Sequence, residues 1–218
     1  MPTSQLAFDL PALQTLRRED FFASPANAQA LASLSDPSAR RLLLIGPPGA
    51  GKTHLAHIWA AETGARMLDA ASLPVLLPDL HPDAAIAIDN ADALRNDAAL
   101  FHLYNLLAPQ GRLLLTAATP PRHWGLALPD LYSRLQTITQ CHIDPPDDAL
   151  LSAVLVKLFT DRQITVPPNL IAYLVTRMER SIAAARSLVA ELDATALARG
   201  RPVTRALAGE VLDKTLPG

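Results

Sequence analysis

Apolar residues follow two patterns along this chain, and the change from one pattern to the other divides it. Up to about residue 145, short unbroken apolar runs such as Leu42-Leu43-Leu44-Ile45 alternate with longer segments in which apolar residues recur every three or four positions. Unbroken runs of this length are typical of parallel strands buried on both faces, whereas the three- and four-residue spacing is typical of helices. Their alternation predicts an α/β domain built on a parallel sheet.

The apolar runs predict five strands, at residues 42–45, 66–70, 84–89, 112–116 and 139–143. Helical spacing predicts helices at residues 28–34, 54–63, 97–109 and 128–135. We expect Gly64 and Gly111 to end two of these helices, because glycine readily adopts the left-handed backbone that closes a helix.

From Asp144-Pro145-Pro146-Asp147 onward the spacing is helical, at residues 148–161, 168–178, 181–197 and 203–212. We therefore expect three parts: an N-terminal peptide at residues 1–12, an α/β domain at residues 13–145 and a helical domain at residues 146–218. Charges in the helical part nearly balance, which favours a small helix bundle over a basic module that reads DNA.

Composition narrows the class of protein. Half of the 218 residues are apolar, and the formal net charge of -2 gives no whole-chain footprint for nucleic-acid binding. The single cysteine, Cys141, excludes an internal disulfide and suits a reducing compartment. No apolar run approaches the length of a membrane span, and the first ten residues lack the basic start and hydrophobic core of a signal peptide. We expect a cytoplasmic protein with no membrane partner.

The first predicted strand leads into a glycine-rich loop that has the spacing of a Walker A motif. Its residues are Gly46, Pro47, Pro48, Gly49, Ala50, Gly51, Lys52 and Thr53, followed by His54 in the next helix. Glycines let backbone N–H groups turn inward around a phosphate, Lys52 adds a positive charge, and the Thr53 hydroxyl is a ligand for Mg²⁺. The alternative, a glycine-proline turn before an ordinary helix, explains less of this spacing.

Two later strands end in residues suited to the same site. Asp89 ends the run at residues 84–89, where a carboxylate can hold Mg²⁺ or its water, and the alternative is a strand that stops at an Asp-Asn turn. Asn90 follows it, and a carboxamide cannot accept a proton from an attacking water near neutral pH, so we expect slow hydrolysis by the chain itself. Thr116 can contact a terminal phosphate or simply close its strand.

Three further features have two interpretations each from the residues alone. Arg134 lies near the end of a short predicted helix, where a solvated surface charge is the simpler interpretation. Arg180 and Arg186 flank the start of a late helix and either reach phosphates or lie on the helix surface. In the opening segment the apolar Leu6, Phe8 and Leu10 alternate with Gln5, Ala7 and Asp9. The apolar side chains therefore pack either on this protein or in a groove of another one, and the candidate docking residues are Gln5, Leu6, Phe8 and Leu10.

Together these segments resemble the AAA+ ATPases and, within them, the DnaA/Hda family. The resemblance covers nearly the whole chain and implies a P-loop AAA+ domain with a five-stranded parallel sheet and a C-terminal α-helical lid. It rests on the loop at residues 46–53 with His54 and Leu55, on Ile88-Asp89-Asn90, on Thr116 with Pro120-Pro121-Arg122, on Leu128-Pro129-Asp130-Leu131 with Ser133-Arg134-Leu135, and on the helical lid.

The resemblance implies roles for these residues. Arg134 matches the family's arginine finger, which acts in trans on the ATP of another chain, and Asn90 and Thr116 lie at catalytic positions. ADP or ATP with Mg²⁺ is the implied cofactor. One departure is that Ala183 stands where a sensor 2 arginine is expected, with Arg180 and Arg186 about one turn to either side. Whether either arginine replaces it stays open.

The family also implies partners. The segment from Gln5 to Leu10 is similar to the peptide with which Hda-like members dock on the DNA polymerase sliding clamp. The chain ends at Gly218 without room for the DNA-reading helix-turn-helix domain of the initiator, so we expect DNA to be contacted only indirectly. The resemblance implies clamp-dependent inactivation of the DnaA initiator by stimulated ATP hydrolysis, and it also allows a homo-oligomer. The alternatives are a self-sufficient oligomeric ATPase such as a helicase loader, or a DNA-associated adaptor without a catalytic contribution.

Overall fold

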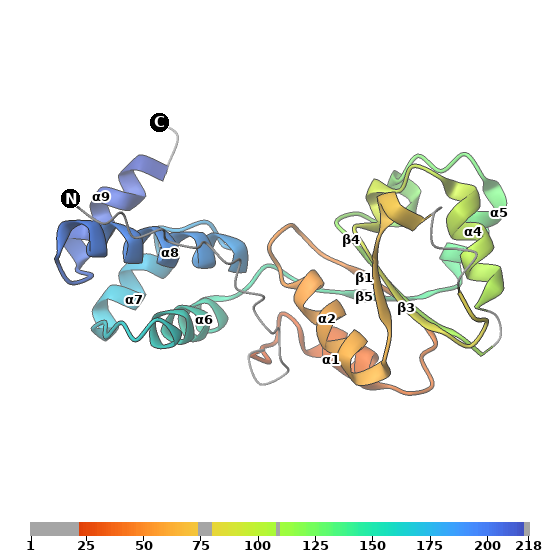
Figure 1. Ribbon diagram of the computed structural model, residues 1–218, viewed down its shortest axis with the longest axis horizontal. Coiled ribbons are helices and arrows are strands. Elements are labelled where there is room, and N and C mark those ends of the chain that lie inside the picture. Colours follow the sequence, from red (N-terminus) through yellow and green to blue (C-terminus); the bar gives the residue numbers. More distant parts are fainter. Residues whose placement is uncertain (1–21, 74–79, 108–109, 216–218) are drawn as a thin grey trace, which may run out of the picture.

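The computed structural model describes residues 22–73, 80–107 and 110–215. Figure 1 shows two parts beside each other, an α/β part that contains the sheet and a helical part formed by the last four helices. No helix of the described residues is both long and apolar enough to cross a membrane.

The sheet has five parallel strands in the order β2-β3-β4-β1-β5, which confirms the predicted five-stranded parallel sheet. The strands are β1 (Arg41–Ile45), β2 (Arg66–Asp69), β3 (Ala85–Asp89), β4 (Arg112–Ala117) and β5 (Thr139–His142). Because all strands run the same way, their carboxyl ends share one edge. In register, Leu44 lies beside Thr116 and Asp69 beside Asp89, so the residues that follow β1, β3 and β4 meet there.

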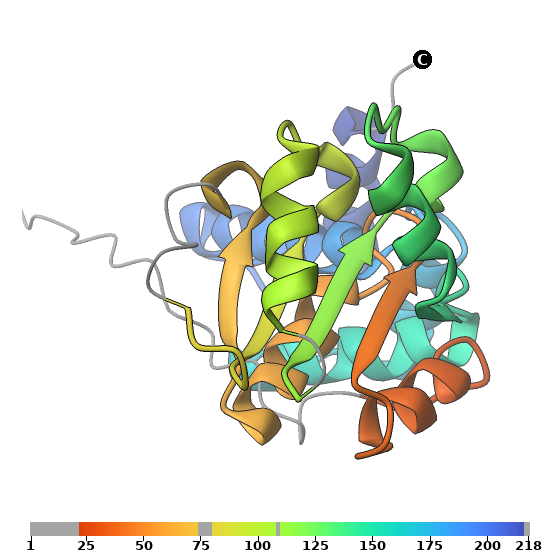
Figure 2. The ribbon, with the colours of Figure 1, turned by 90° about the vertical axis from the view of Figure 1, so that its right-hand side faces the viewer.

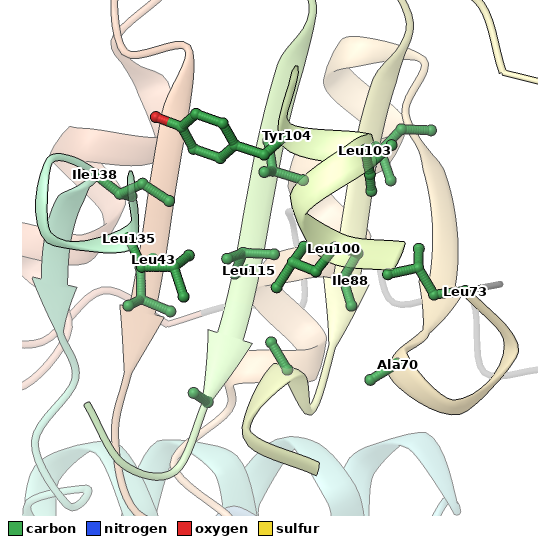
Figure 3. Close-up of a cluster of buried hydrophobic side chains, with 14 of the residues drawn as sticks. Leu43, Ala70, Leu73, Ile88, Leu100, Leu103, Tyr104, Leu115, Leu135 and Ile138 are labelled. Carbon is green, nitrogen blue, oxygen red and sulfur yellow. The ribbon is translucent and has the colours of Figure 1, made fainter. Parts of the chain in front are cut away.

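The alternation of side chains along the strands explains why both faces of the sheet are covered. In β1, Leu43 and Ile45 belong to one buried cluster, whereas Leu42 and Leu44 belong to another. Helices α4 (Asp97–Leu106) and α5 (Pro129–Gln136) supply the first cluster, which Figure 3 shows, and α4 crosses in front of the strands in Figure 2. Helices α1 (Ala28–Ser35) and α2 (Lys52–Thr63) supply the second.

Two helices, α4 and α7 (Pro168–Val175), end earlier than their spacing predicts. Gly64 closes α2 in a left-handed conformation with φ 70°, as predicted. The helix expected at residues 97–109 ends at Leu106 instead, because the amide of Gly111 donates to the carbonyl of Leu107 and turns the chain toward β4. Three single 3₁₀ turns, Ala70–Ser72, Ala91–Ala93 and Pro121–His123, were not expected from the spacing.

The helical part consists of α6 (Asp148–Asp161), α7 (Pro168–Val175), α8 (Ile182–Arg199) and α9 (Arg205–Thr215). Three side chains begin these helices by accepting backbone N–H groups: Asp147 accepts from Leu150 at 2.7 Å, Ser181 from Ala184 at 3.0 Å and Thr204 from Leu207 at 3.3 Å. Helix α7 ends three residues before the predicted Met178, whose amide turns back to the carbonyl of Leu174.

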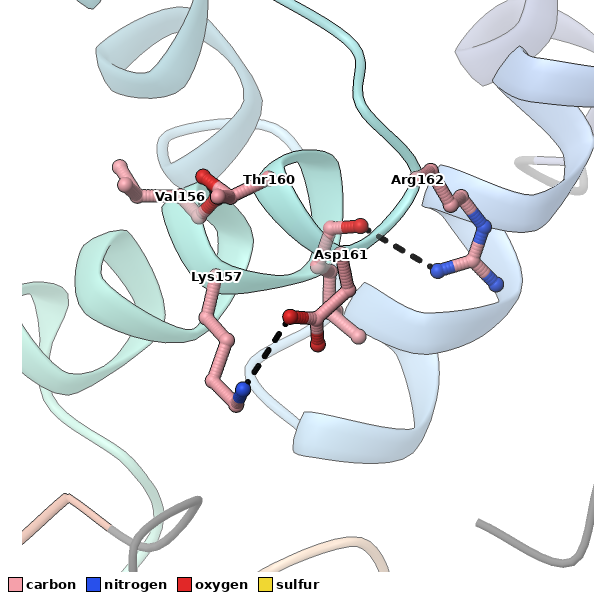
Figure 4. Close-up of polar contacts among 6 residues, drawn as sticks. Val156, Lys157, Thr160, Asp161 and Arg162 are labelled. Atoms are coloured by element: carbon pink, nitrogen blue, oxygen red, sulfur yellow. Dashed lines mark hydrogen bonds and ion pairs between the residues drawn. The ribbon is translucent and has the colours of Figure 1, made fainter.

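The helical part has a hydrophobic cluster of its own, which runs from Leu151 to Leu212 and is separate from the two clusters on the sheet. Surface contacts fix the end of α6, where Lys157 pairs with Asp161 at 3.2 Å and Arg162 donates to the carbonyl of Leu158 (Figure 4). We keep the division into residues 13–145 and 146–218 as a proposal, since each part buries its own core.

Candidate functional site

The loop at residues 46–51 joins the carboxyl end of β1 to the first turn of α2. Gly49 and Gly51 have φ values of 74° and 99°, which side chains with a Cβ rarely adopt. A Cβ on Gly46 would lie 2.6 Å from the carbonyl oxygen of Ile143. Gly51 is the N-cap of α2 and has no side chain to accept its first N–H groups. The loop therefore leaves backbone donors and the positive end of the helix available for an anion.

Lys52 is anchored over this loop. Its Nζ donates to the carbonyl oxygens of Gly46 at 2.8 Å and of Pro47 at 2.9 Å, and the residue is 8% exposed. An ammonium group has three N–H donors, so one donor is left for a phosphate oxygen. Burial lowers the pKa of Lys52, and the charges of Asp92 and Asp89 oppose that shift.

A chain of hydrogen bonds joins the ends of three elements around Asp89. Thr53 Oγ1 donates to Asp89 Oδ2 at 2.9 Å, Thr116 Oγ1 donates to Asp89 Oδ1, and the amide of Asn90 donates to Thr116 Oγ1 at 3.1 Å. Each of the two carboxylate oxygens therefore holds one hydroxyl. The structure brings the predicted residues Thr53, Asp89 and Thr116 together at one point on the carboxyl edge.

Asn90 has a left-handed backbone, with φ 54° and ψ 45°. Asparagine and aspartate tolerate this conformation better than other residues that carry a Cβ. The residue is exposed and lies at the start of the 3₁₀ turn Ala91–Ala93. It stands beside Asp89 but supplies a carboxamide where a general base would need a carboxylate.

The helical part contacts the tip of the loop directly. The amide of Ile182 donates to the carbonyl of Gly49 at 2.9 Å, and a Cβ on Gly49 would lie 2.4 Å from Cβ of Ser181. A cavity of about 740 Å³ opens beside this contact. Pro48 and Gly49 line it from the loop, and Arg177, Met178, Ala183, Ser187 and Leu212 are among the residues that line it from the helical part.

The two candidate arginines of the helical part differ in their contacts. Arg180 pairs with Asp148 at 2.7 Å and donates to the carbonyl of Pro146 at 3.4 Å, so it ties α8 to the start of α6. Arg186 is half-buried within α8. A phosphate contact by either arginine stays a prediction, and Ala183 lines the cavity with no charge of its own.

Arg134 lies far from the loop. Its guanidinium carbon is 5.9 Å from the centroid of the Tyr104 ring, and that of Arg41 is 3.9 Å from the same centroid. Arg41 is the first residue of β1, whereas the loop begins five residues later at Gly46. Because each strand residue advances the chain by about 3.3 Å, the Cα atoms of Arg41 and Gly46 are about 16 Å apart along the strand. Arg134 is therefore at the amino edge of the sheet, opposite the loop.

A comparison with protein families agrees with a phosphate-binding loop after β1. A family model described as "ATPase family associated with various cellular activities (AAA)" matches residues 42–186, from β1 into α8. The chain belongs to this AAA family of ATPases. Among solved structures, domain III of the replication initiation protein DnaA from Thermotoga maritima has a TM-score of 0.81 at 18% identity, and the match covers 96% of this chain and 100% of that chain.

Two further solved structures show how widely this AAA fold is shared. A replication initiator DnaA bound to AMPPCP and single-stranded DNA has a TM-score of 0.70 at 16% identity, covering 85% of this chain and 67% of that chain. The Holliday junction branch migration motor RuvB of Thermotoga maritima has a TM-score of 0.66 at 17% identity, and the match covers 86% of this chain and 65% of that chain. At these identities the likeness shows the fold, which is that of DnaA domain III.

The residues of this AAA chain fit a nucleotide phosphate and a hydrated Mg²⁺. The loop offers backbone N–H groups and one ammonium donor, and Thr53 and Asp89 offer two oxygen ligands. In residues 22–73, 80–107 and 110–215, no three His, Cys, Asp or Glu side chains are grouped to hold a metal. Mg²⁺ commonly binds through one or two protein oxygens, water and substrate phosphates, so the donors present suit it.

Sequence reasoning missed Asp92. Its Oδ2 accepts the amide of Ala118 at 2.8 Å, which fastens the end of β4 to the turn after β3, and its charge acts on Lys52. The available signal was a second carboxylate three residues after Asp89. The predicted docking residues Gln5, Leu6, Phe8 and Leu10 lie outside the described residues, as does the boundary at residue 12.

Proposed function

We propose that this AAA chain is an Hda-like negative regulator of replication initiation. In this proposal the chain carries its own nucleotide and stimulates hydrolysis of the ATP bound by a DnaA initiator. The observation that carries the proposal is the position of Arg134, an exposed arginine at the amino edge of the sheet, beside the Tyr104 ring and Arg41. That edge is opposite this chain's own phosphate loop.

The position of Arg134 supports a role in trans. Arg134 shares the Tyr104 ring with Arg41, and Arg41 begins the strand whose other end, about 16 Å away, leads into the loop. The Arg134 guanidinium is therefore at the edge of the sheet opposite a phosphate bound in its own loop. On the surface of a complex, the same guanidinium can enter the site of a neighbouring ATPase. A positive charge at a γ-phosphate stabilises the charge that develops on its oxygens, an effect worth roughly 10³ to 10⁵ in rate.

Asn90 supports slow turnover of the chain's own nucleotide. Its carboxamide cannot take a proton from water near neutral pH, and its backbone is already engaged with Thr116. The hydrogen-bonded Thr53 and Asp89 would hold Mg²⁺ and its water without activating a nucleophile. Bound ADP or ATP would then act mainly as a clip between the phosphate loop and the lid.

The N-terminal peptide supplies the proposed tether. Leu6, Phe8 and Leu10 alternate with smaller or polar residues, so an extended peptide presents three apolar side chains on one side. Such a peptide suits an apolar groove, and the resemblance names the groove as that of the DNA polymerase sliding clamp. A clamp on DNA would bring this chain close to DnaA, so DNA contributes indirectly. A homo-oligomer through the same two edges is compatible with this arrangement.

The decisive experiment measures ATP hydrolysis by DnaA in the presence of a DNA-loaded clamp and this protein in its ADP form, with each component omitted in turn. We expect Arg134→Ala to lower the stimulated rate by about 10² or more while ADP binding is unchanged. Arg95→Ala is the matched control, since Arg95 is also exposed in the α/β part.

Two outcomes would favour the alternatives. Steady turnover of ATP by the isolated chain would indicate a self-sufficient ATPase. Full stimulation by Arg134→Ala would remove the finger assignment and favour an adaptor without a catalytic contribution, whose affinity for bare DNA should fall steeply with salt.

A further inference from the structure

Tyr104 contacts two guanidinium groups with one ring. It belongs to α4, is 4% exposed and is packed in the cluster that includes Leu135 and Ile138 (Figure 3). The guanidinium carbons of Arg41 and Arg134 lie 3.9 Å and 5.9 Å from its ring centroid. Both distances lie within the range of about 6 Å in which a cation is attracted to an aromatic face. The ring thus contacts the proposed finger and a second cation.

The phenol hydroxyl makes a second connection to the same arginine. Tyr104 Oη lies 3.5 Å from Thr137 Oγ1, and that hydroxyl donates to the carbonyl of Arg134 at 2.7 Å. Thr137 is the C-cap of α5. The last turn of α5 is therefore linked to α4 through both its guanidinium and its backbone, and the ring is held by the core of the sheet.

The surroundings of this ring are positively charged. Arg40, Arg41, Arg112 and Arg134 all lie at or beside the amino edge, where β1 and β4 begin. Arg40 donates to the carbonyl of Gln110. The guanidinium of Arg112 lies 5.3 Å from the Trp59 ring, which belongs to the cluster on the other face of the sheet, so Arg112 adds charge to this edge but does not face Tyr104. In the part of the chain that the structure describes, none of the four is paired with a carboxylate. Because the guanidinium carbons of Arg41 and Arg134 lie 3.9 Å and 5.9 Å from one ring centroid, they are within about 10 Å of each other and repel, so this edge favours an anion from a partner.

We propose that Tyr104 and Arg41 are positioning residues for Arg134. The ring fixes the direction of the Arg134 guanidinium, and Arg41 fixes the ring and repels Arg134 outward, toward the phosphates of the ATP held by the partner. This inference rests on the proposed function, because it concerns how the finger is aimed. The position of the guanidinium affects the rate strongly, since displacing a catalytic group by about 1 Å can lower the rate about 10²-fold.

The test compares Tyr104→Leu with Tyr104→Phe in stimulated ATP hydrolysis by DnaA, titrating this protein so that the maximal rate and the apparent affinity are obtained separately. Leucine keeps apolar volume but removes the ring, whereas phenylalanine keeps the ring and removes only the hydroxyl. We expect Tyr104→Leu to lower the maximal rate about tenfold or more at unchanged apparent affinity, and Tyr104→Phe to keep it within about threefold. Arg41→Gln should lower the maximal rate, and Arg41→Lys should restore part of it.

Arg134→Ala, measured alongside, separates the two proposals. If Arg134→Ala leaves stimulation unchanged, the proposed function fails. If Arg134→Ala abolishes stimulation but Tyr104→Leu and Arg41→Gln both keep the full maximal rate, only the positioning role is overturned. Thermal unfolding and ADP binding are measured for every variant. Should Tyr104→Leu fail to fold, Arg41→Gln and Thr137→Val decide, and an unchanged maximal rate in both overturns the inference.

Discussion

The amide of Ile182, the first residue of α8, donates a hydrogen bond of 2.9 Å to the carbonyl oxygen of Gly49 in the phosphate loop. Ser181, the N-cap of α8, lies against the same glycine. The lid therefore contacts the loop through backbone atoms as well as side chains. A change in the conformation of the loop has to alter the position of α8, and the reverse also holds.

Gly49→Ala should weaken this contact and nucleotide binding together. The new Cβ would lie 2.4 Å from Cβ and 2.8 Å from Oγ of Ser181, in a backbone with φ 74°. We expect ADP affinity to fall about tenfold or more and the melting temperature to drop, measured by titration and thermal unfolding.

Gly125→Ala is the matched control for that variant. Gly125 also has a positive φ, 68°, but a Cβ there meets no atom within 4 Å. It should therefore show the cost of backbone strain without the clash. Equal effects of the two variants on ADP affinity would refute a role for the contact with Ser181.

Nucleotide affinity should decrease at alkaline pH because of Lys52. Burial lowers its pKa below 10.5, the ordinary value for lysine, so the ammonium loses its proton at a lower pH than an exposed lysine would. ADP affinity, measured by titration from neutral to alkaline pH, should fall as the pH rises through the lowered pKa. The Lys52→Met variant should bind ADP weakly, and its ADP affinity should lack the decrease that deprotonation of Lys52 causes at alkaline pH.

The same shift has a consequence for stability. Between the lowered folded pKa and 10.5, the unfolded chain binds more protons at Lys52 than the folded chain does, so this residue's contribution to the free energy of unfolding rises with pH in that window. Below the folded pKa, the burial penalty on the charged form is fully present. Lys52→Met should remove this pH-dependent contribution, and an unfolding free energy that changes with pH as in the wild type would contradict it.

Asn90→Asp should increase hydrolysis of ATP by the isolated chain. Aspartate tolerates the left-handed backbone at this position, so the substitution introduces a carboxylate with little strain. If the carboxamide limits turnover, the rate should rise about tenfold or more, measured as phosphate release without partners. Asn90→Ala supplies the control that removes the amide without adding a base, and an unchanged rate in Asn90→Asp would show that another step is limiting.

Loss of the apolar side chains of the N-terminal peptide should abolish binding to the sliding clamp. We expect Leu6→Ala with Phe8→Ala to remove clamp binding in a surface-immobilised assay while ADP affinity is unchanged. Asp9→Ala is the control, because Asp9 alternates with the apolar positions. Retained clamp binding by the double variant would eliminate the tether from the proposed function.

The sequence predicted what depends on local pattern. Buried parallel strands read as unbroken apolar runs, and the loop's glycines and Lys52 have a spacing that phosphate binding requires, so the sheet and this loop could be predicted. Asp92 was missed because its importance comes from a tertiary hydrogen bond to Ala118. The premature ends of α4 and α7 likewise depend on turns fixed by hydrogen bonds to Leu107 and Leu174.

Long-range relationships were outside the reach of a pattern. Tyr104 looks like any other apolar-face residue of α4, and only folding brings it to Arg41 and Arg134. Gly49 is one glycine among three in its loop, and its contact with Ser181 joins segments more than a hundred residues apart.

The strands separate the phosphate loop from Arg134, so the chain presents unlike surfaces at its two ends. Subunits that join through unlike surfaces form a row with a direction and two different ends. Under the proposed function, this protein would add only to the end of a row of DnaA subunits whose ATP is uncovered. The stimulated hydrolysis would then depend on the number of such ends and not on the number of DnaA subunits, so a few molecules of this protein would suffice for a long row.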